Sequence, residues 1–138
     1  MPAQKPSSTG LSVIRDIQTA PDLICFSHLR WDSVFQRPHH LLKRFSSEHR
    51  VFFVEEVEFE DAPSHLEYRQ DESGIEVVVP WISASIEGFD KKAIQRALVD
   101  QLLEERKISR FIAWYYNPRA YGYTCHLQPA LTVYDAMD

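Results

Sequence analysis

Two unbroken apolar runs, residues 23–26 and 51–54, are the feature that most constrains the fold of this chain. Each run is short and bounded by polar residues, which is typical of a strand buried on both faces in a parallel sheet. Pro38 between them suits the first turn of a helix, and apolar positions then recur on one helical face. The sequence therefore predicts a strand, a helix over residues 38–48 and a second strand over residues 50–54.

The same alternation continues along the rest of the chain. The further predicted elements are a strand pair over 66–69 and 75–80, a helix over 90–106, a strand over 111–115, a short helix after Asn117-Pro118 and a strand over 131–134. Alternating strands and helices predict an α/β fold with a doubly wound, mostly parallel, Rossmann-like sheet. We expect the strand order 3-2-1-4-5, with the strand pair contributing to one edge.

The size of the chain suits one domain, because it has 138 residues. Hydrophobic residues make up 44% and charged residues 25%, which is a globular composition. The net charge of −5 argues against a general nucleic-acid binder. We predict a flexible N-terminal tail over residues 1–20 and a Rossmann-like domain over residues 21–138.

Cysteine content and hydropathy favour a cytoplasmic protein. Cys25 and Cys125 do not make a disulfide framework, and a reducing compartment is the simplest setting for them. No apolar run approaches the length of about 20 residues that spans a bilayer. Charge is unevenly distributed, with a basic stretch at 28–50 and an acidic one at 55–61. The acidic stretch is predicted as an exposed loop, and a contact with a partner is the alternative.

Candidate binding residues follow the predicted strands, because ligands of open α/β sheets sit at the carboxyl ends of the strands. The turn after the first strand offers hydrogen-bond donors, positive charges and an indole, which favours a polar molecule that is ring-shaped or anionic. The predicted substrate-binding residues are His28, Arg30, Trp31, Asp32, Arg37, Glu55, Tyr116, Asn117, Asp135 and Asp138.

The charged candidates each have two interpretations. His28 is a weak candidate for the catalytic acid or base, because its pKa lies near neutrality, and it can equally cap a loop. Arg30 and Arg37 can grip a phosphate or carboxylate in bidentate fashion. Their alternative role is an ion pair with Glu55 or Glu56.

The remaining candidates are also open. Trp31 can stack on a sugar ring or pack beneath its own loop. Asp135 and Asp138 can accept hydrogen bonds from hydroxyls or cap a following helix. His39 and His40 are adjacent on a helix and point about 100° apart, so they do not chelate one metal, and we expect a solvated or partly packed face.

Several common sites are missing from the sequence. It contains no Gly-x-Gly-x-x-Gly or Walker loop for phosphates, no Gly-x-Ser-x-Gly nucleophile elbow and no Cys/His spacing of a metal site. The sequence therefore predicts no cofactor and no metal in these residues.

The motifs FSHLRWD…QRPHHLL, VFFVEE, WYYNP and YDAMD resemble a known family. Together with the segments around them (22–42, 50–56, 78–81, 113–118 and 133–138), they look like the N-terminal part of bacterial glycosyltransferases of the GT-B architecture, group 1 type. The resemblance covers most of residues 22–138, and the first motif is its most specific part.

The resemblance implies one half of a two-domain enzyme. GT-B enzymes face two Rossmann-like domains across a cleft, with the acceptor held mostly by the N-terminal domain and the nucleotide-sugar by the C-terminal one. It implies an incomplete, catalytically inactive acceptor domain, working in polysaccharide biosynthesis on a sugar or glycan hydroxyl without a metal bound by this domain. In that reading Arg30, Trp31, Tyr116 and Asn117 would position the acceptor. The alternative is a stand-alone flavodoxin-like binding or interaction module, and an exposed sheet edge would allow a homodimer.

Overall fold

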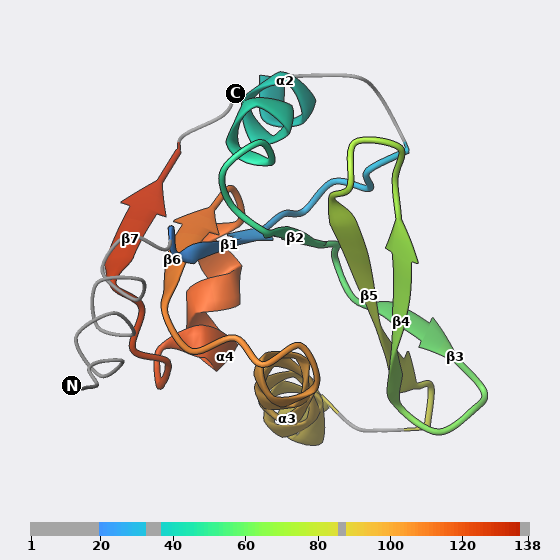
Figure 1. Ribbon diagram of the computed structural model, residues 1–138. Helices are drawn as coiled ribbons and strands as arrows, with labels where there is room; N and C mark the ends of the chain where they lie inside the picture. The colour runs from blue at the N-terminus through green and yellow to red at the C-terminus, as the bar shows by residue number, and fades with distance from the viewer. Residues whose placement is uncertain (1–19, 33–36, 86–87, 136–138) are drawn as a thin grey trace, which may run out of the picture.

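The computed structural model describes residues 20–32, 37–85 and 88–135, and the predicted tail over residues 1–20 lies almost wholly outside this range. The fold is α/β, as predicted (Figure 1). Its strands are β1 (Asp22–Phe26), β2 (Val51–Val54), β3 (Glu58–Glu60), β4 (His65–Gln70), β5 (Glu76–Ser83), β6 (Phe111–Tyr115) and β7 (Leu131–Tyr134). Its helices are α2 (Arg37–Phe45), α3 (Gly88–Glu105), the 3-10 turn η1 (Pro118–Ala120) and α4 (Tyr121–Thr124).

The described strands form one mostly parallel sheet. Its order is β3-β5-β2-β1-β6-β7, with β4 pairing antiparallel to β5. Taking β5 as the third strand, this is the predicted 3-2-1-4-5 order with the β4–β5 hairpin at one edge. The order reverses between β1 and β6, whose parallel pairing runs from Asp22 opposite Phe111 to Phe26 opposite Tyr115.

The sheet has a hydrophobic core on each face. Figure 1 shows α2 on one side of the sheet and α3 with α4 on the other. Neighbouring residues of one strand supply both cores, since Phe52 packs on the α3 side and Phe53 on the α2 side. This double burial explains why β1 and β2 read as continuous apolar runs rather than as alternating ones.

Helix α3 ends in a Schellman motif. The N–H of Ile108 bonds to the carbonyl of Leu103 over 2.8 Å, and the N–H of Lys107 reaches the carbonyl of Glu104 over 3.3 Å. Lys107 holds the left-handed conformation that the motif needs, with φ of 54°. Ile108 and Leu103 then both belong to the core on this face, so the motif directs the chain into β6.

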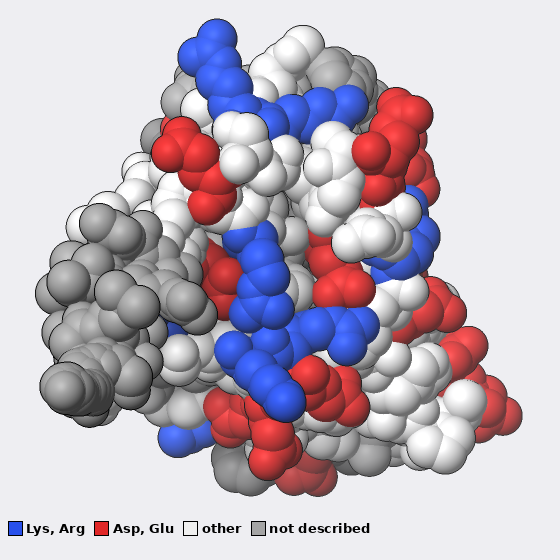
Figure 2. Space-filling model, viewed as in Figure 1, with Lys and Arg blue, Asp and Glu red and all other residues white. Residues whose placement is uncertain are grey.

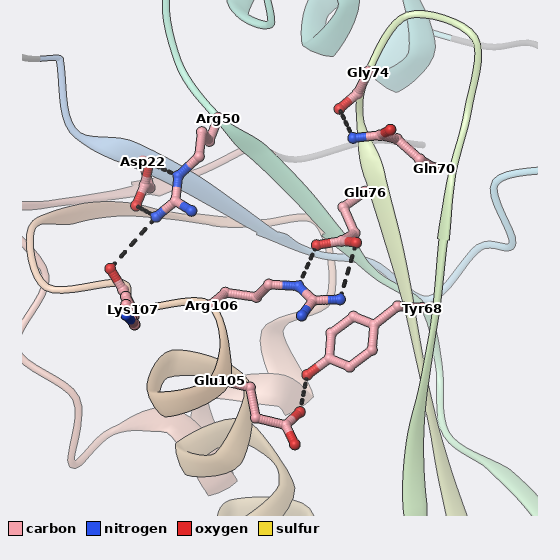
Figure 3. Close-up of polar contacts among 9 residues, drawn as sticks. All are labelled: Asp22, Arg50, Tyr68, Gln70, Gly74, Glu76, Glu105, Arg106 and Lys107. Atoms are coloured by element: carbon pink, nitrogen blue, oxygen red, sulfur yellow. Dashed lines mark hydrogen bonds and ion pairs between the residues drawn. The ribbon is translucent and has the colours of Figure 1, made fainter.

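A polar network ties the end of α3 to the β4–β5 hairpin (Figure 3). Arg106 donates to both carboxylate oxygens of Glu76, over 2.6 and 3.1 Å, and its guanidinium lies 3.8 Å from the centre of the Tyr68 ring. The Tyr68 hydroxyl donates to Glu105 over 2.6 Å. On the face that Figure 2 presents, Lys and Arg side chains run down the middle with Asp and Glu on both sides, so opposite charges alternate there.

The acidic stretch departs from its prediction. Residues 58–60 form β3, which pairs parallel with the end of β5 from Glu58 opposite Trp81 to Glu60 opposite Ser83. Glu55 is only 4% exposed. The prediction of an exposed loop over 55–61 is therefore wrong, because the long β5 extends beyond β2 and offers backbone partners to whatever follows β2.

Among the described strands, β7 lies at the opposite edge of the sheet. Leu131 and Tyr134 on this strand are 56% and 60% exposed, although Tyr134 stacks on Tyr115 at a centroid distance of 5.2 Å. None of the described helices combines the length and the apolar character needed to cross a bilayer.

Candidate functional site

Backbone hydrogen bonds bring together the segments that follow three strands, at the carboxyl end of the sheet. The N–H groups of Tyr116 and Asn117 both donate to the carbonyl of Phe26, over 2.9 and 3.1 Å. The N–H of Asp135 donates to the carbonyl of Tyr115 over 3.0 Å. The predicted meeting of these segments at the carboxyl ends of the strands is thus present in the structure, whereas Asp138 lies outside the described residues.

Trp31 packs beneath its own loop, which is the second of its two predicted roles. The side chain is 6% exposed and contacts Phe53 edge-on at a centroid distance of 5.0 Å. The ring of His39 lies 4.2 Å away, and its Nε2 hydrogen-bonds to the Trp31 carbonyl. An indole enclosed in this way has no face for a sugar, so the stacking role predicted for Trp31 is corrected. His39 itself is 4% exposed, and the expectation of a solvated or partly packed histidine face holds only for the exposed His40.

A buried carboxylate holds the segment that follows β1. Glu55 Oε2 accepts a 2.8 Å hydrogen bond from the N–H of Trp31. Arg69 of β4 lies 3.8 Å from the same oxygen and 2.6 Å from Oδ2 of Asp32. Glu55 therefore binds protein groups, and Asp32 is anchored to the β4–β5 hairpin, toward which Figure 1 shows this segment running.

Arg30 forms an ion pair with Glu58 of β3. The partner of Arg30 in this ion pair is thus neither Glu55 nor Glu56, the two residues that were predicted. Arg69 instead takes the position beside Glu55. Two guanidinium groups thus tie the segment after β1 to the sheet, and carboxylates already neutralise them.

A hollow of about 390 Å³ opens between this segment and the hairpin. Its lining residues are Arg30, Asp32, Glu55, Glu67, Arg69, Val79 and Trp81. Trp81 is partly buried, its Nε1–H donates to Glu67 over 3.2 Å, and the His65 ring lies nearly parallel to it at 6.2 Å. The hollow therefore combines a flat aromatic ring with charged hydrogen-bonding groups, which is the composition of a site for a polar ring.

Strand register explains why these side chains converge. Residues that lie opposite each other on adjacent strands point to the same face of the sheet. The pairing of β4 with β5 places His65 opposite Trp81 and Glu67 opposite Val79. Leu66 and Tyr68 point the other way and pack against the α3-side core. The sequence interpretation missed Glu67 and Arg69. The alternation of His65, Glu67 and Arg69 with apolar residues was the available signal.

The described candidates that follow β6 and β7 do not line the hollow; these are Tyr116, Asn117 and Asp135. Tyr116 is 4% exposed, and burial, aided by the Asp135 carboxylate, raises its pKa above the ordinary value. Asn117 is 6% exposed and caps η1, its Oδ1 accepting from the N–H of Arg119 over 3.1 Å. Both side chains are buried in contacts within the protein. Neither Tyr116 nor Asn117 therefore presents an open surface for the predicted role in a cleft.

Two further candidates are placed only in outline. His28 is exposed just after β1, where the neighbouring Leu29 N–H bonds to Ser27 Oγ over 2.9 Å. Arg37 opens α2. The catalytic role suggested for His28 stays a prediction.

The described residues hold no group of three or more His, Cys, Asp or Glu side chains arranged to bind a metal ion. Comparisons of the chain with protein-family models, with curated proteins and with solved structures gave no match.

Proposed function

We propose that this chain is the acceptor-binding domain of a glycosyltransferase and that the hollow between the segment after β1 and the β4–β5 hairpin holds a sugar ring of the acceptor. The observation that carries the proposal is the placement of Trp81 beside charged groups in one open hollow. An aromatic ring packs against the apolar face of a pyranose, and carboxylates and guanidinium groups bond to its hydroxyls.

The rest of the reaction follows from this role. The nucleotide-sugar donor would bind a second domain, because the turn after β1 has no glycine loop and is filled by Trp31 and its contacts. The sugar would pass to an acceptor hydroxyl in polysaccharide biosynthesis, in the cytoplasm. In this proposal the acceptor would lie on the hairpin side of the sheet rather than where the strand order reverses.

Binding of neutral oligosaccharides to this chain tests the proposal. Glucan and mannan oligomers should show saturation transfer in NMR and shift the Trp81 indole resonance, whereas a nucleotide-sugar should show no tight binding in calorimetry. Trp81→Ala should abolish the oligosaccharide signal. Tyr134→Ala is the matched control, because Tyr134 is an exposed aromatic on the opposite edge of the sheet. Equal binding by both variants would refute the assignment of the hollow.

The exposed β7 edge favours a second candidate, a non-catalytic interaction module or homodimer. An exposed edge strand with apolar side chains pairs readily with another chain. Leu131 and Tyr134 give β7 this character. Sedimentation at increasing concentration should then show a dimer that Leu131→Lys disrupts. A monomer at every concentration would remove this candidate.

A further inference from the structure

We infer that the sugar held in the hollow carries a free amino group, so that the preferred acceptor is a positively charged amino sugar. The inference rests on the proposed sugar-binding role of the hollow and adds the substrate class. It follows from the balance of charges around Trp81.

The hollow has an excess of negative charge. Arg30 is matched by Glu58, and Arg69 is shared between Asp32 and Glu55. Glu67 is exposed at the wall, so carboxylates outnumber guanidinium groups. A phosphate or uronate would meet this excess and find both guanidinium groups already paired. The anionic ligand that the sequence suggested is therefore disfavoured.

Glu67 is the wall carboxylate available to a ligand. Its contact in the described structure is the Trp81 indole N–H, and no Lys, Arg or His among the described residues lies within ion-pair distance of it. The nearest histidine along its strand face, His65, pairs instead with Glu60 over 3.6 Å. A cation from the ligand would complete this position.

Trp81 favours the same charge. A cation near the face of an indole is attracted to the ring, and the bond from the indole N–H to Glu67 fixes ring and carboxylate side by side. An ammonium group on a pyranose can contact both while the sugar ring lies over the indole. A hydroxyl or an acetamide at the same carbon lacks the charge that both groups attract.

Matched trimers test the inference. β-1,4-linked trimers of glucosamine, glucose and N-acetylglucosamine have the same backbone and differ at one substituent. We expect the glucosamine trimer to bind about tenfold more tightly than the other two, the combined effect of a cation–π contact and an exposed charge pair. Calorimetry at low salt measures the affinities, and the Trp81 indole resonance reports the location.

Charge variants locate the effect. Glu67→Gln should bring the three affinities to within about twofold of one another while glucose-trimer binding persists. Glu104→Gln removes the same charge from an exposed position of helix α3, on the other face of the sheet, and should keep the glucosamine preference. Equal binding of the three trimers by the unmodified chain, or an unchanged preference in Glu67→Gln, would overturn the inference and leave the proposed function standing. Binding of none of the trimers would overturn both.

Discussion

The main-chain N–H of Trp31 donates a 2.8 Å hydrogen bond to the carboxylate of Glu55, a residue 24 positions later that is 4% exposed. The bond joins the segment after β1 to the end of β2. Arg69 lies beside the same carboxylate, so one acid ties three parts of the chain together. Buried polar groups that serve several partners are costly to remove.

Replacing this carboxylate should therefore destabilise the fold. Glu55→Ala leaves the Trp31 N–H buried without an acceptor, and we expect the free energy of unfolding to fall by about 2–4 kcal/mol. Glu56→Ala, at the exposed neighbouring position, should change it by less than about 0.5 kcal/mol. Urea unfolding followed by tryptophan fluorescence measures both. Equal losses would show that the Trp31 bond contributes nothing of its own.

Lys107→Gly should stabilise the protein. Lys107 has φ of 54°, a conformation that costs a residue with a Cβ atom more than it costs glycine. We expect a gain of about 1 kcal/mol in the free energy of unfolding, measured by urea titration. Lys107→Ala removes the same side chain and keeps the Cβ atom, so it should give no gain. A gain in both variants would point to the lysine charge instead.

The two thiols should differ in reactivity. Burial raises the pKa of the Cys25 thiol well above its ordinary value, and the nearby Asp135 carboxylate adds to the effect, whereas Cys125 is exposed. Because the thiolate is the reactive form, a maleimide should label Cys125 in the native protein and Cys25 only after unfolding. Mass spectrometry over a denaturant series reports both sites. Rapid native labelling of Cys25 would contradict its burial on β1.

Stability should fall at alkaline pH. Burial raises the pKa of Tyr123 to about 12, and burial also raises the pKa values of Tyr68 and Tyr116. The native protein therefore keeps phenolic protons that the unfolded chain loses near its ordinary pKa of about 10. By linkage, the contribution of these groups is complete below about pH 10 and is lost as pH rises through the folded-state pKa values.

Urea midpoints from about pH 8 to about pH 11 measure this slope. Tyr116→Phe removes one of the titrating groups and should make the decline shallower. Tyr134→Phe is the control, because Tyr134 is 60% exposed. An equal decline in both variants would show that Tyr116 titrates alike in the folded and unfolded states.

Elements set by local pattern were predictable. β6 and β7 match their predicted ranges, and Asn117-Pro118 caps a turn as expected. The strand order follows from alternation and from the right-handed crossover rule. For β6, β7 and the cap, the residues of a single segment carry the signal, whereas the strand order needs only the sequence of elements along the chain.

Features that depend on contacts with distant parts of the chain were not predictable from the sequence. β3 is three residues long, and its strand state comes from pairing with the overhanging end of β5. Trp31 is buried because Phe53 and His39, from other elements, surround it. Glu67 and Arg69 reach the hollow only through the register of β4 on β5. Such contacts depend on how strands align, which the pattern of one strand does not specify.

Two acids fix the segment after β1: Glu55 begins the link from β2 to β3, and Glu58, three positions later, is the first residue of β3. The length of that short link sets the spacing between the two acids. Adding or deleting one residue in the link would change the spacing of Glu55 and Glu58 and turn one of the two side chains to the opposite face of the sheet. The length of the link is therefore expected to tolerate less variation than the identity of its middle residues.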